Sequence, residues 1–161
     1  MPVKQKLSSR IIDDKDKEII MLLQKDGRMS LTEIAKKVRL SIDSVHKRIK
    51  EMIKKGVFYP GIFVEPRVIG YPLLADVKIK LKDLNEEKKD AMIQYLVKHK
   101  SVIDLLGIMG DYDLTCVLIA RNSEELEKVS MEIRQKFRDL IGEWKSVLIL
   151  KTYKFEQYDL I

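Results

Sequence analysis

Cysteine, histidine and long apolar runs are scarce in this sequence. Its 161 residues include one cysteine, Cys116, and two histidines, His46 and His99. A single cysteine excludes a disulfide framework or a thiolate metal cluster within one chain. No uncharged run exceeds nine residues, whereas a membrane span needs about 18 apolar residues. Residues 1–6 lead into charged sequence and not into an apolar signal segment. We therefore expect a cytoplasmic protein without a membrane partner, a metal or a cofactor.

Positive charge is concentrated in the first third of the chain. The net charge is +6, and residues 1–60 carry 15 basic against 8 acidic side chains. Residues 61–161 carry 16 basic against 17 acidic side chains. This division favours two small domains, the first with a polyanionic partner such as double-stranded DNA. A solvated, lysine-rich helical surface would give the same count, so charge alone leaves both interpretations open.

The first sixty residues predict three short helices, at about 14–26, 31–38 and 42–55. Asp13, Ser30 and Ser41 are residue types that cap helix N-termini, and Ser30 forms a capping-box pattern with Glu33. Gly56 ends the third helix. Because only a few residues separate the second and third helices, the sequence predicts a helix-turn-helix at about 31–50 within a domain 1–60.

The third helix supplies the candidate DNA-binding residues. Its apolar stripe turns inward, so side chains on the opposite face and its shoulders would face the major groove. The candidates are Ser41, Asp43, Ser44, Lys47, Arg48, Lys50 and Lys54. The first four lie where recognition helices contact base edges, whereas the last three suit phosphates. His46 falls beside the apolar stripe, and we interpret it as a packed or edge histidine in preference to a base reader.

The remaining chain alternates strand and helix. Strands are predicted at 73–81, 102–109, 112–120 and 146–153, with helices at about 85–98 and from 123 until Gly142. Residues 61–72 read as an extended linker before a domain 73–161. The order βαββαβ predicts an α+β chain whose second domain is ferredoxin-like, with two helices covering one face of a four-stranded antiparallel sheet. The uncovered face favours a homodimer or a higher homo-oligomer.

These features together resemble the Lrp/AsnC (feast/famine) family of transcriptional regulators. The resemblance rests on the acidic start of the first helix, residues 13–20, on the helix-turn-helix, and on the turn Gly110-Asp111-Tyr112-Asp113. It implies that the second domain assembles oligomers and binds an amino acid or similar metabolite. Carried over to this chain, the effector site includes Gly110, Tyr112 and Asp113, with Asp111 in the variable position. Arg39 departs from the pattern, because such proteins usually have a turn glycine there.

The chemistry of that turn fits a ligand site and also fits an ordinary hairpin. The backbone of Gly110 allows close approach of a ligand, and Asp111 or Asp113 could pair with an amino group. Glycine and aspartate are equally common in turns that bind nothing.

The leading functional hypothesis is a sequence-specific DNA-binding regulator that is not an enzyme. One alternative is an enzyme similar to siroheme decarboxylases, which share this architecture and use histidines near a tetrapyrrole. Another is a metabolite sensor that does not bind DNA. Cys116 lies in a predicted strand and reads as a buried apolar residue, not as a nucleophile.

Overall fold

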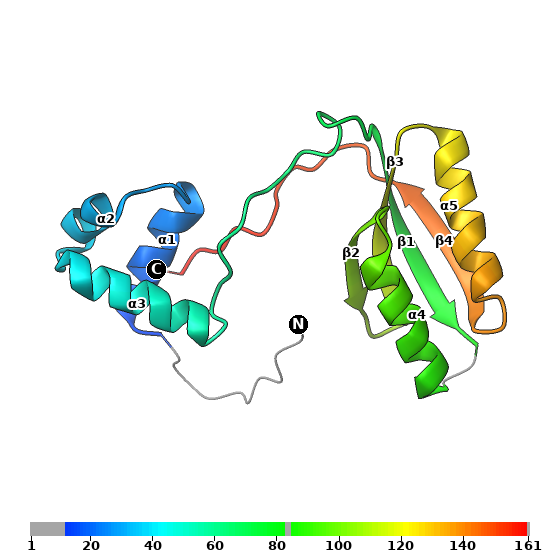
Figure 1. Cartoon of the computed structure of the whole chain (residues 1–161), viewed down its shortest axis with the longest axis horizontal. Helices are drawn as coiled ribbons and strands as arrows, with labels where there is room; N and C mark the ends of the chain where they lie inside the picture. The colour runs from blue at the N-terminus through cyan, green and yellow to red at the C-terminus, as the bar shows by residue number, and fades with distance from the viewer. Residues whose placement is uncertain (1–11, 83–84, 161) are drawn as a thin grey trace. The chain divides into compact units, whose positions relative to one another are not determined.

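The computed structural model describes residues 12–82 and 85–160. They form two compact units, residues 12–63 with 154–160 and residues 64–153 (Figure 1). By its contacts the C-terminal segment 154–160 lies with the helical unit, whereas the sequence predicted one domain over residues 73–161. Residues 1–11, 83–84 and 161 of the predicted domains lie outside the described residues.

Three capped helices form the first unit. They are α1 (Asp14–Lys25), α2 (Leu31–Val38) and α3 (Ile42–Lys54). Asp13 and Ser30 each make a complete capping box, and the Ser41 hydroxyl accepts a hydrogen bond from the Ser44 N–H. Each cap satisfies backbone donors that a helix N-terminus leaves without intrahelical partners. The helices enclose a core of Ile19, Ile34, Ala35, Val38, Val45 and Met52.

The turn between α2 and α3 forces one residue into the left-handed conformation. Arg39 has φ 56° and ψ 50°, and its N–H closes α2 by donating to the Ala35 carbonyl. It is the one described non-glycine residue with positive φ. A side chain there costs about 1–2 kcal/mol relative to right-handed helical backbone. The turn therefore keeps a geometry that favours glycine, although the sequence has arginine.

The second unit is a four-stranded antiparallel sheet covered by two helices. Its elements are β1 (Leu73–Leu81), α4 (Glu86–Lys98), β2 (Val102–Gly107), β3 (Leu114–Ala120), α5 (Ser123–Lys136) and β4 (Ile141–Leu148). The strand order is β2-β3-β1-β4. Alternate residues of β1, among them Val77 and Ile79, pack with Met92 of α4 and Ile133 of α5. This arrangement confirms the predicted ferredoxin-like fold and leaves the opposite sheet face uncovered by this unit's helices.

Two predicted boundaries were wrong. The last strand begins at Ile141, and Gly142 lies inside it and not at the end of α5. Trp144 pairs with Ile79 of β1 and packs against the core, so the strand begins earlier in the chain than its predicted start at residue 146. The connection between β2 and β3 is a six-residue loop, 108–113, in place of a tight two-residue turn, and the Ile108 N–H donates to the Asp113 carbonyl.

The segment after β4 makes specific contacts. The Arg67 guanidinium donates to the Ile149 carbonyl at 2.7 Å within the sheet unit. In the helical unit, the Phe63 and Phe155 rings meet edge to face with centroids 5.0 Å apart. The Gln24 side chain both donates to the Tyr158 carbonyl, at 3.0 Å, and accepts from its N–H, at 2.9 Å. The Gln24 side chain thus makes two hydrogen bonds to the backbone of Tyr158. This contact holds the chain end against α1 (Figure 1).

None of the helices within residues 12–82 and 85–160 combines the length and the apolar character needed to cross a membrane.

We expect Arg39→Gly to raise the free energy of unfolding by about 1 kcal/mol, because glycine adopts positive φ without a steric penalty. Urea unfolding followed by circular dichroism measures this. Lys36→Gly is the matched control: it replaces an exposed residue inside α2 and should lower the free energy of unfolding by about 1 kcal/mol. Unchanged or lower stability of Arg39→Gly would contradict the assigned strain.

Candidate functional site

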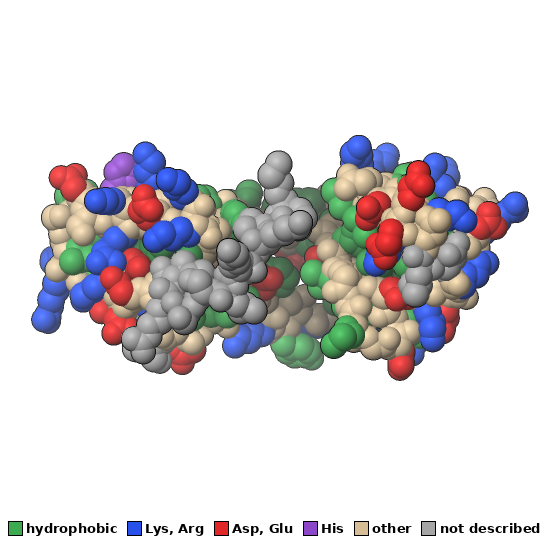
Figure 2. All heavy atoms as spheres, turned by 90° about the horizontal axis from the view of Figure 1, so that it is seen from below, with side chains coloured by type: hydrophobic (Ala, Val, Ile, Leu, Met, Phe, Trp, Pro, Cys, Tyr) green, Lys and Arg blue, Asp and Glu red, His purple; other side chains and the backbone are tan. Residues whose placement is uncertain are grey.

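One face of α3 is exposed and mostly basic. Asp43, Lys47, Lys50 and Lys54 are exposed, as predicted, whereas Val45 and Met52 on the opposite face are buried. Ser41 is exposed with its hydroxyl engaged in the cap, and Ser44 is half-buried. On the helical unit, Figure 2 shows lysine and arginine side chains with a histidine and several acidic side chains among them. The arrangement brings the predicted lysines to one surface that a phosphate backbone can approach.

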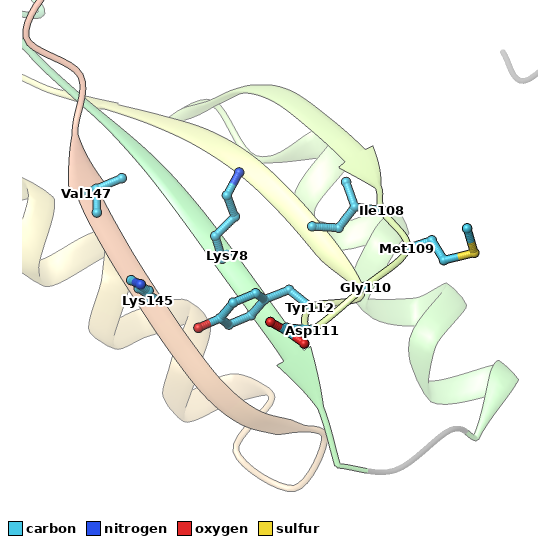
Figure 3. Close-up of a pocket in the computed structure, with 8 residues that line it drawn as sticks. All are labelled: Lys78, Ile108, Met109, Gly110, Asp111, Tyr112, Lys145 and Val147. Atoms are coloured by element: carbon cyan, nitrogen blue, oxygen red, sulfur yellow. The ribbon is translucent and has the colours of Figure 1, made fainter.

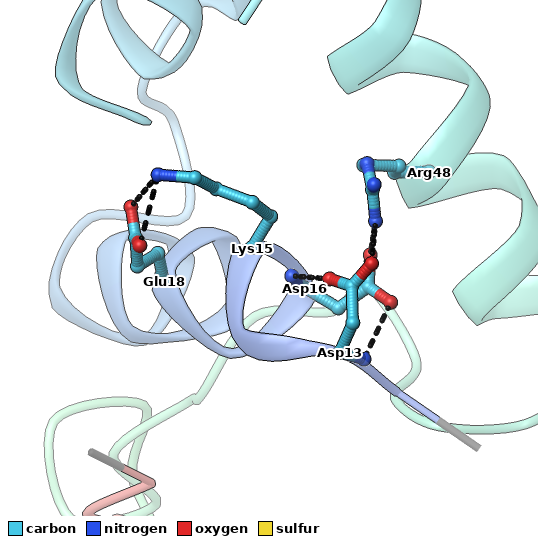
Figure 4. A network of polar contacts seen from close by, with 5 residues as sticks. All are labelled: Asp13, Lys15, Asp16, Glu18 and Arg48. Carbon is cyan, nitrogen blue, oxygen red and sulfur yellow. Dashed lines mark hydrogen bonds and ion pairs between the residues drawn. The ribbon is translucent and has the colours of Figure 1, made fainter. Parts of the chain in front are cut away.

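Arg48 does not belong to this surface, although it was predicted as a phosphate contact. Its Nη1 donates to Asp13 Oδ2 at 2.7 Å and to Asp16 Oδ1 at 2.8 Å (Figure 4). The hydrogen bond from Arg48 lowers the pKa of Asp13, helped by the Asp16 backbone N–H. Arg48 therefore joins α3 to the start of α1. Sequence patterns did not indicate this contact, because Asp13 and Asp16 lie more than thirty positions before Arg48 in the chain.

His46 is exposed on the same side of α3 as Lys47 and Lys50, so of the two predicted positions, packed or at the edge of the apolar stripe, it does not occupy the packed one. At about 100° per residue, position 46 lies about 40° from position 50. Helical spacing alone therefore indicates that His46 lies on the exposed side near Lys50, whereas the neighbouring Val45 suggested a position closer to the core.

A second candidate site lies at the loop between β2 and β3. A hollow of about 380 Å³ opens there on the uncovered sheet face (Figure 3). It is lined by Lys78, Ile108, Met109, Gly110, Asp111, Tyr112, Lys145 and Val147. Gly110 has φ +144°, a conformation that strains any other residue. The loop, β1 and β4 therefore combine a glycine backbone without a side chain, an aromatic ring and both signs of charge around one space.

Tyr112 is fixed in orientation within this pocket. Its hydroxyl donates to Glu143 Oε1 at 2.6 Å, and this hydrogen bond raises the pKa of Tyr112 above its usual value. The ring therefore reaches from the loop toward β4 (Figure 3). Lys78 is also held, because its Nζ lies 2.9 Å from Asp76 Oδ2 and 3.0 Å from Thr115 Oγ1.

Asp113 does not line the pocket, contrary to its predicted role. Its carboxylate accepts a hydrogen bond from the Leu81 N–H at 2.7 Å, and its own N–H donates to the Ile79 carbonyl at 3.0 Å. Asp113 thus anchors the loop to the end of β1. Lys78 and Lys145 were missed, although their alternation with core residues in β1 and β4 places them on the uncovered face.

The remaining chemical candidates do not form a site. Cys116 is buried, and burial raises the pKa of its thiol to about 12. The His99 Nδ1 accepts the Ser101 N–H, and its ring lies beside Tyr95 and Glu132 between α4 and α5. Within the described parts of the chain, no three His, Cys, Asp or Glu side chains are grouped so that they could hold a metal ion.

Both units match known domain families. Residues 12–58 match winged helix-turn-helix DNA-binding domains, and residues 74–158 match the Lrp/AsnC ligand-binding domain. The chain belongs to the Lrp/AsnC family. It is a DNA-binding transcriptional regulator with a domain for a small metabolite, and this confirms the resemblance found in the sequence.

Relatives of the Lrp/AsnC family match along most of the chain. The transcriptional regulator FL11 of Pyrococcus furiosus is 34% identical over 151 residues, which cover 89% of this chain and 93% of the relative. The regulator LrpA of Pyrococcus horikoshii is 35% identical over 120 residues, covering 74% of this chain and 83% of the relative.

Solved structures show the same Lrp/AsnC fold. A Neisseria meningitidis transcriptional regulator in complex with L-Met superimposes with a TM-score of 0.79 at 17% identity, covering 89% of this chain and 93% of that chain. E. coli AsnC has a TM-score of 0.79 at 22% identity, covering 92% and 99%.

We expect Arg48→Gln to lower the free energy of unfolding, because it removes the charged hydrogen bonds to Asp13 and Asp16. The loss should be only about 1 kcal/mol, since the Asp13 side chain is 55% exposed and solvent screens the pair. The pKa of Asp13 is lowered in the folded state, so this stabilisation is present at neutral pH. It is lost as the pH falls through that lowered pKa, below the usual aspartate value of about 3.9. Urea unfolding at neutral and acid pH measures it.

Lys50→Gln, at an exposed position of the same helix, is the control and should leave stability nearly unchanged. A loss in Arg48→Gln that persists undiminished in acid would contradict the ion pair.

Proposed function

We propose that this Lrp/AsnC protein is a sequence-specific regulator that acts as a homodimer or a larger homo-oligomer and responds to an amino acid. The observation that carries the proposal is the exposed face of α3, on which Lys47, Lys50 and Lys54 lie together on a capped and packed helix. Lysines that line a helix in the major groove neutralise phosphates and set the register of the protein on DNA.

The pocket at the 108–113 loop supports an amino-acid effector. A free amino acid carries a carboxylate and an ammonium group, and the pocket supplies Lys145 and Asp111 for these charges. Ile108, Met109 and Val147 add apolar surface for a side chain. The L-Met bound by the structurally similar Neisseria regulator is consistent with this class of ligand.

The uncovered sheet face supports assembly through a second copy of the chain. Leu106 is 52% exposed and Val147 is 47% exposed on this face, on either side of the Asp76, Lys78 and Thr115 polar cluster. Apolar side chains around a satisfied polar cluster suit a self-complementary interface. Two recognition helices would then lie about 34 Å or a multiple apart and require a roughly palindromic operator.

The protein is proposed to act in the cytoplasm, without catalysis or a cofactor. The enzyme alternative needs histidines around one tetrapyrrole. His99 instead packs between two helices of the sheet unit, and His46 is exposed on α3 of the helical unit. A visible absorption band in the purified protein would favour that alternative. A protein that binds a metabolite and no duplex at any salt concentration would favour the DNA-silent sensor.

We expect DNA affinity to fall steeply with salt because binding releases counterions from phosphates. Lys54→Ala should reduce the slope of log K against log salt by about 1 on all sequences. Fluorescence anisotropy with two unrelated duplexes measures both effects. Arg48→Gln is the contrasting variant, since its guanidinium is bound to two carboxylates, and it should leave the slope unchanged. Equal affinity at low and moderate salt would refute the electrostatic mode.

We expect at least one amino acid to bind at the loop pocket. Calorimetry with the twenty amino acids identifies it, and Lys145→Ala should weaken its binding about tenfold or more because a charged hydrogen bond is lost. Lys128→Ala, an exposed position on α5 away from the pocket, should bind normally. Equal binding by wild type and Lys145→Ala would exclude that residue from the site.

We expect Val147→Glu to dissociate the oligomer, because it would bury an unpaired carboxylate in the interface. Met131→Glu is the matched control, since Met131 on α5 has the same exposed fraction of 47%. Sedimentation velocity should show smaller particles for Val147→Glu only. A change in both variants, or in neither, would argue against assembly through the sheet face.

A further inference from the structure

Ile42, the first residue of α3, exposes an apolar side chain on the DNA-facing helix. Its exposed fraction is 46%, although isoleucine is usually buried. The core cluster formed by the described residues of the helical unit does not include it, and Val45, Ile49 and Met52 supply the inward face of α3 instead. Ile42 is therefore not one of the residues that form the core of this unit.

The two ends of α3 differ in charge. No lysine or arginine occurs between residues 40 and 46, whereas Lys47, Lys50 and Lys54 follow. Asp43, beside Ile42, is exposed and would repel a phosphate. The first turn therefore suits uncharged base edges, and the later turns suit the backbone of the duplex.

The major groove offers one apolar group to a side chain there, the C5 methyl of thymine. We propose that Ile42 contacts a thymine methyl group and so contributes to the sequence preference of this regulator. This inference rests on the proposed docking of α3 in the major groove. Asp43 is then placed to accept a hydrogen bond from the exocyclic amino group of a neighbouring cytosine, the pairing that offsets its repulsion from phosphates.

The test begins with selection of preferred sequences by the full-length protein from a pool of random duplexes. In the selected duplex, each thymine is then replaced in turn by uracil, which keeps base pairing and removes only the methyl group. At one position in each half-site, uracil should weaken binding by wild type about fourfold, the value of one buried methyl group. Ile42→Ala should bind the thymine duplex more weakly than wild type and bind thymine and uracil duplexes equally.

Lys54→Ala is the matched control on the same helix. It should bind both duplexes more weakly and keep the fourfold preference for thymine, because a phosphate contact does not read the methyl group. Circular dichroism should show that Ile42→Ala folds normally, since the side chain lies outside the core.

Two outcomes would overturn the inference on Ile42 alone. One is a selected sequence on which no uracil replacement weakens wild-type binding. The other is a uracil replacement that weakens binding by Ile42→Ala as much as it weakens binding by wild type. If selection enriches no sequence at all, sequence-specific binding itself fails, and the role of Ile42 fails with it.

Discussion

The helical unit depends on the contact between Arg48 and the two aspartates at the start of α1. Asp13 caps α1 and accepts a hydrogen bond from Arg48, while Asp16 completes the capping box and accepts a second one. One cluster thus caps the start of α1 and joins it to α3 (Figure 4). Helical spacing places Lys47, Lys50 and Lys54 on one side of α3, and with Val45 and Met52 in the core that side is exposed.

In the loop between β2 and β3, one residue anchors the backbone while others line the pocket. Asp113 binds the backbone at the end of β1 and leaves Gly110, Asp111 and Tyr112 to line the hollow. A ligand site on a loop needs a rigid support, since loops otherwise carry the mobility of their exposed backbone. The aspartate at the end of the Gly-Asp-Tyr-Asp sequence therefore anchors the loop and does not itself line the hollow.

Local patterns predicted most of the fold. The capping boxes at Asp13 and Ser30 and the alternation in β1 depend on residues close in sequence, and those helices and strands were found within a few positions. The start of β4 was missed because Trp144 is placed by Ile79, 65 positions earlier in the chain. The site residues divide in the same way: helical spacing brought the lysines together, whereas the partners of Arg48 and Asp113 are distant in sequence and required the folded chain.

The return of the chain to the helical unit bears on how a sensor of this kind influences its DNA-binding part. The chain crosses between the units twice, once at residues 63–64 and again at 153–154. A unit attached by one linker can turn about it at little cost, whereas two crossings must bend together or release their contacts. Here the contacts are the Arg67 bond to Ile149 and the Gln24 bonds to Tyr158. β4 supplies Lys145 and Val147 to the pocket and continues along the chain into the second crossing, so the pocket strand and the segment that Gln24 binds at Tyr158 are connected by a short stretch of chain.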